Sequence, residues 1–514
     1  MGRHLGLSSA HDDVVMPASD GSRVLDICLI TEGTYPFHDG GVSVWCDQLV
    51  RGMAPHRFAV DAVTATGSEV PSWDLPSNVR SVRSVPLWGP IPPVRAAKKL
   101  DRSVRDTIGQ TLRCIMAPTE TGNFLETLRQ LFFYAQDGNL RRYLRSDDAV
   151  QLALWALGPH ISNGRTLDRL PPRPTVADAV ASLRLLEHLL RPLSVAPPEA
   201  DICHAASNGS GVLLAIAAKW SNGTPFLLTE HGLYLRERYI AYGPFTLPDR
   251  QRAFMLGFYK QLTVAAYQMA DIIAPGSEYN SQWEQANGAD PSKIQLIYNG
   301  IDAPNFASLP SEAESQTISW VSRIDPLKDV KTMLRAFALV RKELPEAKLR
   351  LFGGTPKGNA AYMDECLALH SQLGLGDSAR FEGRIPSITD AYQAGDVVVS
   401  TSISEGFPYS VLEAMACGRA MIATDVGGVG EAVAGVGVLV PPRNPRAVAD
   451  ACIELLRDPS RRANLARQGR SRVRRLFTLD VCIRRYGDIY DSLTGAGSLE
   501  EISSTLVGPA GVFA

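Results

Sequence analysis

The amino-acid sequence predicts an α/β fold of two doubly wound domains that face each other across a cleft, with a helical insertion in the first. A chain of 514 residues is too long for one ordinary hydrophobic core. Near the N-terminus a buried strand, a glycine loop and a helix follow one another, as at the start of a doubly wound domain. From residue 317 strands and helices alternate again, which favours a second parallel sheet.

The first domain is predicted to span residues 23–303 and to open with a strand over Val24–Ile30. A glycine pair, Gly40 and Gly41, follows the loop after this strand, and the pattern becomes helical from Val42. Further strand-like runs lie at 201–204, 225–229, 271–274 and 294–301.

The rest of the chain divides into an insertion, a second domain and two ends. Residues 95–195 carry Leu, Arg and Ala at helical spacing and are predicted to form the insertion. A loose stretch at 302–314 marks the domain boundary, so the second domain spans 304–478. Its predicted elements are strands at 317–321, 348–352, 380–382, 397–400 and 420–423 and a helix at 330–343. Residues 479–496 are expected to form a helix that crosses back to the first domain, and 1–22 and 497–514 are expected to be disordered or loose tails.

Composition and charge exclude several classes of protein. Apolar residues make up 45% and charged residues 21%, as in a soluble globular protein. The formal net charge of -2 argues against a general nucleic-acid binder. A run of arginines between Arg461 and Arg475 is best explained as the solvated face of the last helices.

The eight cysteines are scattered singly and form no C-x-x-C pair or zinc-spaced cluster. We therefore expect reduced thiols in a cytoplasmic protein. The N-terminus lacks the layout of a signal peptide, and the most apolar run, Gly211–Ala218, is far shorter than the roughly 20 residues that cross a bilayer. Recruitment to the inner face of a membrane would need partner proteins.

The sharpest chemical signal is the segment from Ser404 to Gly418, in which Glu405 and Glu413 are separated by seven residues. It follows a strand, turns at Gly406, Phe407 and Pro408, and enters a helix through Tyr409 and Ser410. The N–H groups at the start of such a helix favour an anion such as a diphosphate. Glu413 suits a vicinal diol such as ribose, because a carboxylate only accepts hydrogen bonds. Glu405 can engage the hydroxyl groups of a sugar in the same way.

A pair of cations, Arg323 and Lys328, follows the strand at 317–321. Two cations at the carboxyl end of a strand can stabilise the charge that develops on a departing nucleoside diphosphate. Arg323 offers a planar fork to phosphate, and Lys328 offers a point charge.

Two features of the first domain point toward the same cleft. Gly40, Gly41 and Val42 lie at a strand-to-helix turn, where glycines let the backbone approach a phosphate or sugar. His231 follows the strand at 225–229, and ligands of α/β proteins bind at the carboxyl ends of strands. Weaker candidates of the same kind are Glu230, Arg236, Gly427, Gly428 and Glu431. The G-x-G-x-x-G fingerprint is absent from the first turn, which argues against an NAD enzyme.

These segments resemble the retaining glycosyltransferases of family 4, which have the GT-B fold of two Rossmann-like domains. The resemblance is carried by the E-x7-E segment and runs from about residue 24 to 490. The stretches Thr31–Trp45 and Thr229–Tyr234 are similar, more narrowly, to the PelF branch, the glycosyltransferases of Pel exopolysaccharide synthesis in biofilms.

The resemblance implies a catalytic role for Arg323, Lys328, Glu405 and His231, and a base-contacting loop that includes Arg384 and Ile385. It also implies a UDP-sugar donor, UDP-glucose or a related hexose, and a growing glycan as acceptor. A partner implied in the same way is a polysaccharide synthase complex of the inner membrane.

No cofactor and no metal are expected, because the chain lacks the Asp-x-Asp motif with which glycosyltransferases of the other main architecture hold a metal ion. Asp147–Asp148 and Asp488–Asp491 have the wrong spacing or context. Two alternatives stay open at the level of sequence. One is an inactive GT-B scaffold in a polysaccharide assembly complex, and the other is a nucleotide-sugar hydrolase or phosphorylase-like enzyme.

Overall fold

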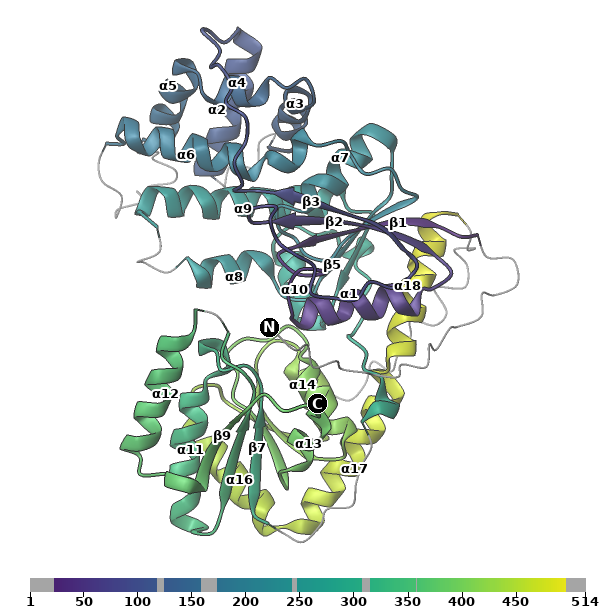
Figure 1. Ribbon diagram of the computed structural model, residues 1–514, viewed down its shortest axis with the longest axis vertical. Coiled ribbons are helices and arrows are strands. Elements are labelled where there is room, and N and C mark those ends of the chain that lie inside the picture. The colour runs from purple at the N-terminus through teal and green to yellow at the C-terminus, as the bar shows by residue number, and fades with distance from the viewer. Residues whose placement is uncertain are drawn as a thin grey trace, which may run out of the picture.

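The computed structural model describes residues 23–117, 124–158, 173–242, 247–306, 315–356 and 358–495. The predicted tails at 1–22 and 497–514, and residues 307–314 of the predicted boundary, lie outside the described residues. Two lobes are stacked along the long axis, each with a twisted sheet covered by helices (Figure 1). The prediction of two facing α/β domains is thus confirmed.

The N-terminal lobe is built on a parallel sheet of six strands in the order β3-β2-β1-β4-β5-β6. Its strands are β1 (Asp26–Glu32), β2 (Arg57–Thr64), β3 (Val79–Pro86), β4 (Ile202–Ala205), β5 (Phe226–Glu230) and β6 (Ile272–Pro275). The helices around it are α1 (Gly41–Gly52), α7 (Val212–Asn222), α8 (Tyr234–Ala241), α9 (Asp249–Met269) and α10 (Glu278–Ala286). The chain adds β2 and β3 on one side of β1 and then β4 to β6 on the other side. The strand order therefore reverses between β1 and β4, and doubly wound folds bind ligands at such a point.

The C-terminal lobe repeats this topology, with six parallel strands in the order β12-β11-β10-β7-β8-β9. The strands are β7 (Thr317–Val321), β8 (Lys348–Phe352), β9 (Ala379–Gly383), β10 (Val397–Ser400), β11 (Ala420–Thr424) and β12 (Val438–Val440). The helices are α11 (Val330–Glu343), α12 (Ala360–Gln372), α13 (Ile388–Gln393), α14 (Tyr409–Ala416), α15 (Val429–Val433), α16 (Pro445–Arg457) and α17 (Pro459–Leu476). Its switch point lies between β7 and β10, the two strands that precede the predicted cations and glutamates.

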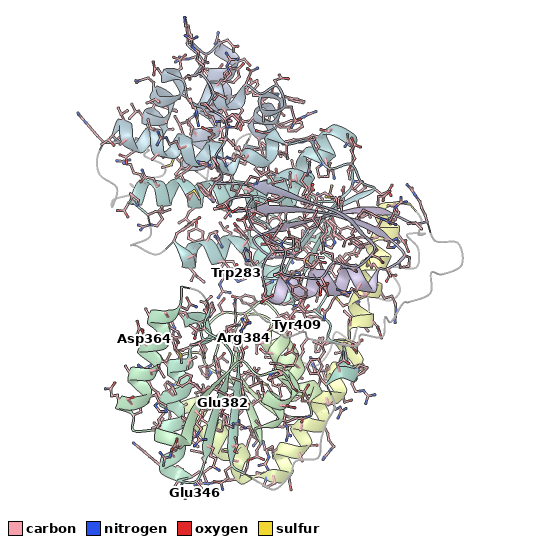
Figure 2. The ribbon with its side chains drawn as sticks, viewed as in Figure 1. Trp283, Glu346, Asp364, Glu382, Arg384 and Tyr409 are labelled. Carbon is pink, nitrogen blue, oxygen red and sulfur yellow. The ribbon has the colours of Figure 1, made fainter. Side chains whose placement is uncertain are left out.

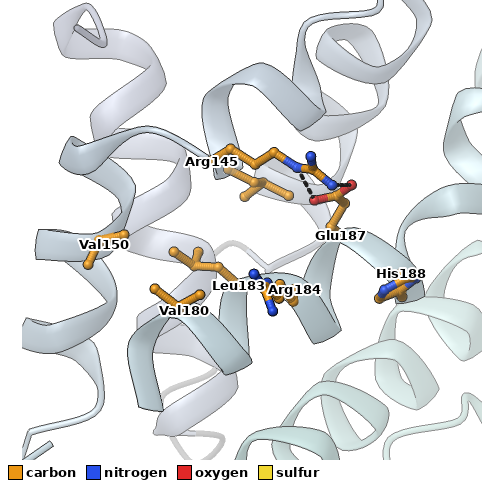
Figure 3. Close-up of a pocket in the computed structure, with 8 residues that line it drawn as sticks. Arg145, Val150, Val180, Leu183, Arg184, Glu187 and His188 are labelled. Atoms are coloured by element: carbon orange, nitrogen blue, oxygen red, sulfur yellow. Dashed lines mark hydrogen bonds and ion pairs between the residues drawn. The ribbon is translucent and has the colours of Figure 1, made fainter. Parts of the chain in front are cut away.

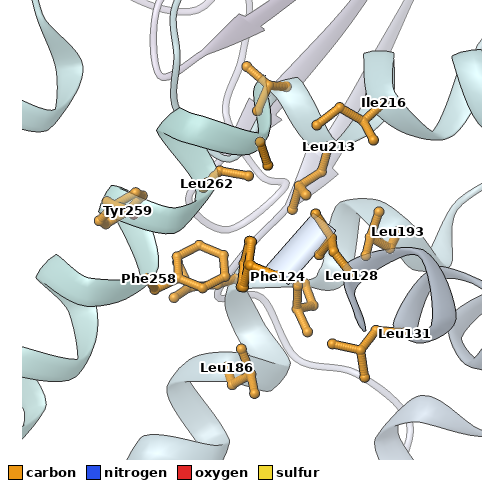
Figure 4. Packing of buried hydrophobic residues seen from close by; sticks show 14 of the residues in the cluster. Phe124, Leu128, Leu131, Leu186, Leu193, Leu213, Ile216, Phe258, Tyr259 and Leu262 are labelled. Carbon is orange, nitrogen blue, oxygen red and sulfur yellow. The ribbon is translucent and has the colours of Figure 1, made fainter. Parts of the chain in front are cut away.

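The described residues of the predicted insertion form the helices α2 (Arg102–Met116), α3 (Phe124–Gln136), α4 (Leu140–Leu144), α5 (Asp147–Ala156) and α6 (Val176–Leu189). They share one apolar core with the N-terminal lobe. Phe124 and Leu128 of α3 pack toward Phe258 of α9 and Leu213 of α7 (Figure 4). The insertion is therefore part of the lobe and not a separate module.

The last described helix, α18 (Leu479–Leu493), returns to the N-terminal lobe and lies beside α1 (Figure 1). Cys482, Tyr486, Ile489 and Tyr490 of α18 belong to the same buried cluster as Trp45. Tyr490 also shares a 2.7 Å hydrogen bond with Nδ1 of His204 on β4. The chain thus closes one face of its first sheet with residues from beyond the second.

The sequence-based expectations need three corrections. Residues 294–301 do not form a strand, because only two isolated bridges occur there, from Ile294 to Ile273 and from Ile301 to Thr478. The first helix begins at Gly41, one residue earlier than expected. The strands β2, β3 and β12 were not predicted.

Candidate active site between the two lobes

A cavity of about 590 Å³ lies where the carboxyl ends of the two sheets face each other. Figure 2 places Arg384 and Tyr409 of the C-terminal lobe on the side that faces the N-terminal lobe. The lining includes every residue predicted for the site: Gly40, Gly41, Val42, His231, Arg323, Lys328, Arg384, Ile385, Glu405, Gly406, Phe407, Pro408, Tyr409, Ser410 and Glu413. Residues that are up to 373 positions apart in the chain thus meet at one cavity, and the contacts below show how each is held.

Two helices begin at this cavity, one from each lobe. The N-terminus of α1 presents Gly40 and Gly41, and that of α14 presents Pro408 and Tyr409. Neither helix has a side-chain cap or an acidic residue in its first turn. Their unpaired N–H groups and aligned dipoles therefore favour an anionic ligand at these two helix ends.

Lys328 and Glu405 form an ion pair at the wall of the cavity, with side chains only 17% and 11% exposed. Ser402 donates a 2.6 Å hydrogen bond to the same Oε1 of Glu405. The backbone of Lys328 is fixed as well, because its carbonyl accepts a 2.9 Å bond from Thr401 Oγ1. The two charges predicted from separate motifs are thus one preorganised unit.

The two arginines of the site reach the cavity from neighbouring turns. Arg323 is exposed and makes no ion pair with any described residue. Arg384 lies over Gly354, where a Cβ atom would come within 2.7 Å of Arg384 Nε. Gly353 beside it has a φ of +135° and touches the carbonyl of Ser322, so only glycine fits there. Because Gly353 and Gly354 have no side chains, they leave room for Arg384 and for the backbone of Ser322 at the cavity wall.

Glu413 lies on α14, one turn in from the helix start, and its carboxylate is oriented by Tyr392. The tyrosine hydroxyl donates a 2.5 Å hydrogen bond to Glu413 Oε2. Burial raises the pKa of Glu413, and the bond from Tyr392 opposes that rise by favouring the carboxylate. The other carboxylate oxygen, Oε1, is available for a ligand hydroxyl at the cavity wall.

His231 faces the cavity from the N-terminal lobe, packed edge-on to Trp45 with ring centroids 4.4 Å apart. Burial lowers its pKa to about 4, so the imidazole is neutral at physiological pH. Its Nε2 is buried and has no protein hydrogen-bond partner among the described residues. The ring therefore borders the cavity without a charge of its own.

The weaker candidates fall outside the lining. Glu230 is 1% exposed, and burial raises its pKa to about 7 while Tyr267 donates a 2.6 Å bond to it. Arg236 lies over the ring of Tyr279 at 5.7 Å. Gly427, Gly428 and Glu431 lie at the contact between the lobes, beside the cavity and not in its wall.

The sequence analysis missed several residues of the wall. Glu237 and Asn299 come from the N-terminal lobe, and Tyr392 comes from α13. Asn299 donates a 2.9 Å hydrogen bond to the carbonyl of Phe407 in the other lobe. None of them lies in a motif, and only the tertiary fold brings them to the cavity.

A second cavity, of about 480 Å³, lies within the helical insertion (Figure 3). Leu144, Val150, Val180 and Leu183 contribute its apolar wall. Its central arginine, Arg145, is neutralised by two bonds of 2.9 Å to the carboxylate of Glu187. It brings together none of the residues predicted for the site, whereas the interlobe cavity brings together all of them except the five weaker candidates.

Neither a metal-ligand cluster nor a membrane-spanning helix occurs among the described residues. No group of three or more His, Cys, Asp or Glu side chains there could hold a metal ion. Likewise, the part of the chain that the structure describes has no helix that is long and apolar enough to cross a membrane. All eight cysteines lie in it, free and buried.

Solved structures with the same architecture define the fold. Sucrose-phosphate synthase from Thermosynechococcus elongatus matches with a TM-score of 0.59 at 21% identity, over 92% of this chain and 100% of that one. Anabaena HepE in complex with UDP and glucose matches with a TM-score of 0.57 at 15% identity, over 91% and 100%. The fold is that of the GT-B glycosyltransferases.

Sequence comparison identifies the family. Residues 315–458 match "Glycosyl transferases group 1", and residues 25–292 match "Domain of unknown function (DUF3492)". The D-inositol 3-phosphate glycosyltransferase of Frankia alni is 32% identical over 52% of this chain and 68% of its own length. The chain belongs to the group 1 glycosyltransferases. It spans about half the length of further relatives of that name, such as the one from Thermobispora bispora, at 35% identity over 39% of this chain and 51% of that one.

Proposed function

We propose that the chain is a retaining, metal-independent glycosyltransferase that moves a hexosyl unit from a UDP-sugar to a glycan acceptor. The donor would be UDP-glucose or a related UDP-hexose. The observation that carries the proposal is the convergence of Arg323, Lys328, Glu405 and Glu413 on a cavity at which two uncapped helices begin.

The donor would lie mainly against the C-terminal lobe. Its diphosphate fits the N-terminus of α14 together with Arg323 and Lys328, and its ribose diol fits the carboxylate of Glu413. Arg384 and Ile385 would border the base. Solved proteins of the same fold support this choice, since HepE has been determined with UDP and glucose and with UDP-glucose.

In the proposed step, the acceptor oxygen forms a bond to the anomeric carbon on the face from which the diphosphate leaves. The electron pair of the broken bond goes to the diphosphate oxygen, which also takes the acceptor proton. Arg323 and Lys328 would stabilise the charge on the departing UDP. Glu405 would hold Lys328 in place, and neutral His231 would bind a hydroxyl of the donor sugar from the opposite lobe.

The acceptor would bind on the N-terminal lobe near Gly41 and His231. We propose a growing exopolysaccharide or another glycan, as in Pel polysaccharide synthesis, on the strength of the similar segments Thr31–Trp45 and Thr229–Tyr234. A cytoplasmic enzyme that serves such a polymer would work beside a synthase complex of the inner membrane, to which partner proteins would recruit it.

A donor screen by calorimetry with UDP-, GDP- and ADP-sugars tests the donor. Preferential binding of UDP-sugars is expected, and equal binding of all three would contradict the proposal. Proton NMR of the product reports the anomeric configuration, and turnover should persist in EDTA. Sugar release without transfer to any acceptor would indicate a hydrolase, and binding without turnover would indicate a scaffold.

A further inference from the structure

Glu431 makes a two-point polar contact between the two lobes. It lies on α15 of the C-terminal lobe, and its two carboxylate oxygens accept hydrogen bonds from the backbone N–H groups of Glu278 (2.8 Å) and Tyr279 (2.9 Å). These are the first two residues of α10 in the N-terminal lobe. A carboxylate of one lobe thus satisfies unpaired donors at the start of a helix in the other.

Both sides of this contact are held in place. Arg472 of α17 donates a 2.7 Å bond to the backbone carbonyl of Glu431. Tyr298 packs on Phe407 at a ring-centroid distance of 4.8 Å, and it opposes the rise that burial causes in the pKa of Glu431. The acceptor is therefore fixed before it meets α10.

The backbones of the two lobes touch next to this contact. A Cβ atom on Gly406 would lie 1.8 Å from the carbonyl oxygen of His231, and one on Gly428 would lie 2.6 Å from the Cβ atom of Ser277. Any side chain at either glycine would push the lobes apart. The hydrogen bonds of Glu431 and the close approach of these two glycines therefore occur in the same arrangement of the lobes.

A direct path leads from the Glu431 contact to the candidate site. The residue after Tyr279 is Asn280, whose Nδ2 donates to the carbonyls of Glu230 (3.2 Å) and His231 (3.4 Å). When Glu431 caps the first turn of α10, it therefore also fixes the side-chain amide of Asn280, which hydrogen bonds to the backbone of His231.

We propose that Glu431 is a positioning residue, an interlobe latch that sets the separation of the lobes and thereby places His231 opposite Arg323 and Glu405. Its effect on catalysis rests on the proposed function, whereas its effect on lobe separation does not. Glu431 lies outside the cavity wall, so it acts through α10 and not by touching the donor.

The test compares Glu431→Ala and Glu431→Gln with Asp101→Ala. Asp101 caps α2 through a 3.0 Å bond to Val104, so its removal costs a helix cap inside one lobe only. For Glu431→Ala, turnover of the donor should fall about tenfold, as expected for the loss of two hydrogen bonds to a charged acceptor. The affinity for UDP should stay within about twofold of the wild-type value, because Arg323 and Glu413, the residues proposed to bind UDP, belong to one lobe. Glu431→Gln should be intermediate, since its amide oxygen still accepts, and Asp101→Ala should turn over as wild type.

Lobe separation is measured without any substrate by single-molecule fluorescence transfer. Dyes on Asp137→Cys and Glu346→Cys, two exposed positions in different lobes, report the distance, and the eight buried native cysteines leave them as the reactive thiols. A longer mean distance or a broader distance distribution is expected for Glu431→Ala. The same is expected for Gly428→Ala, whose added Cβ atom would clash with Ser277 of the other lobe.

Unchanged distances for Glu431→Ala would overturn the latch, whatever Gly428→Ala shows, and so would changed distances with wild-type turnover. If the wild-type protein turned over no nucleotide-sugar, the proposed function would fail, while the distance measurement would still decide whether Glu431 holds the lobes together.

Discussion

Lys328 and Glu405 place opposite charges in direct contact at a cavity whose wall also carries Arg323, Arg384, Glu237, Glu413 and two helix N-termini. The pair keeps the lysine ammonium in a fixed position without a further group to neutralise it. A diphosphate arriving next to the pair would add negative charge on the side of Lys328 that Glu405 leaves free. In the proposed function, this contact would hold the lysine ammonium in place for the leaving group.

Lys328→Ala should lower kcat about 10²- to 10³-fold, the usual cost of losing one preorganised charge at a developing anion. Lys331→Ala is the matched control, because Lys331 is paired with Glu365 on the surface of the same lobe. Initial rates are compared, with circular dichroism to confirm folding. A Lys328→Ala rate within threefold of the control would contradict the role given to Lys328.

Glu413→Ala should weaken UDP binding about tenfold, because the ribose diol loses its charged acceptor. The affinity for 2′,3′-dideoxy-UDP, which lacks both hydroxyls, should stay the same in wild type and variant. Calorimetry on the two nucleotides measures the difference. An equal loss for both nucleotides would show that Glu413 acts on the fold and not on the ribose.

At the residue scale, the sequence predicts those site residues whose surroundings are local. Glu405, Glu413, Arg323 and Lys328 each follow a recognisable strand and turn, so their spacing carries the information. Tyr392, Asn299 and Glu431 lie in no such pattern. Their partners are Glu413, Phe407 and the start of α10, which only the tertiary fold supplies.

At the scale of elements, the sequence predicts strands that are buried along their whole length better than strands that are partly exposed. The strand β7 is buried along its whole length, and its apolar run predicts it at the observed bounds. In contrast, β3 is an edge strand with a mixed sequence, VRSVRSVP, and most of it is only half-buried or exposed. Residues 294–301 are apolar enough to suggest a strand, yet they connect the lobes and pair only through isolated bridges.

The docking of α18 on the first sheet makes stability depend on pH through His204. This residue is 0% exposed, with Tyr490 on Nδ1 (2.7 Å) and Thr229 on Nε2 (2.8 Å). Burial lowers its pKa to about 3 from an ordinary 6.5. Above pH 6.5 both the folded and the unfolded state are neutral at this position, so His204 makes no contribution to the pH dependence of stability there.

Below pH 6.5 His204 binds a proton in the unfolded state but stays neutral in the folded state. The free energy of unfolding should therefore fall by about 1.4 kcal/mol for each pH unit of acidification because of this residue. Urea unfolding of wild type and His204→Gln between pH 4.5 and 7 measures the effect. The variant should show a slope that is smaller by about that amount. Parallel curves would mean that His204 is protonated in the folded state.

At the scale of the whole molecule, electrostatic attraction at the cleft is local. The formal net charge is only -2, yet two helix N-termini and the side chains of Arg323 and Arg384 meet at one cavity. Attraction of an anionic donor therefore depends on how the two lobes face each other and not on the overall charge of the protein.

UDP affinity should fall by about three- to tenfold between 50 and 500 mM NaCl, because the Debye length shrinks below the size of the cavity. Uridine, which has no diphosphate, should bind with nearly constant affinity over the same range. Calorimetric titrations at several salt concentrations compare the two ligands. Equal salt dependence would mean that the phosphates do not lie at the helix N-termini.

The return of α18 to the first lobe also has a consequence during synthesis. The apolar cluster around Trp45 is completed by Tyr486, Ile489 and Tyr490, which a ribosome adds more than four hundred residues later. Until then that surface of the nascent lobe is uncovered, and it is a natural place for a chaperone to bind. The earliest-made sheet is thus among the last parts of the protein to mature.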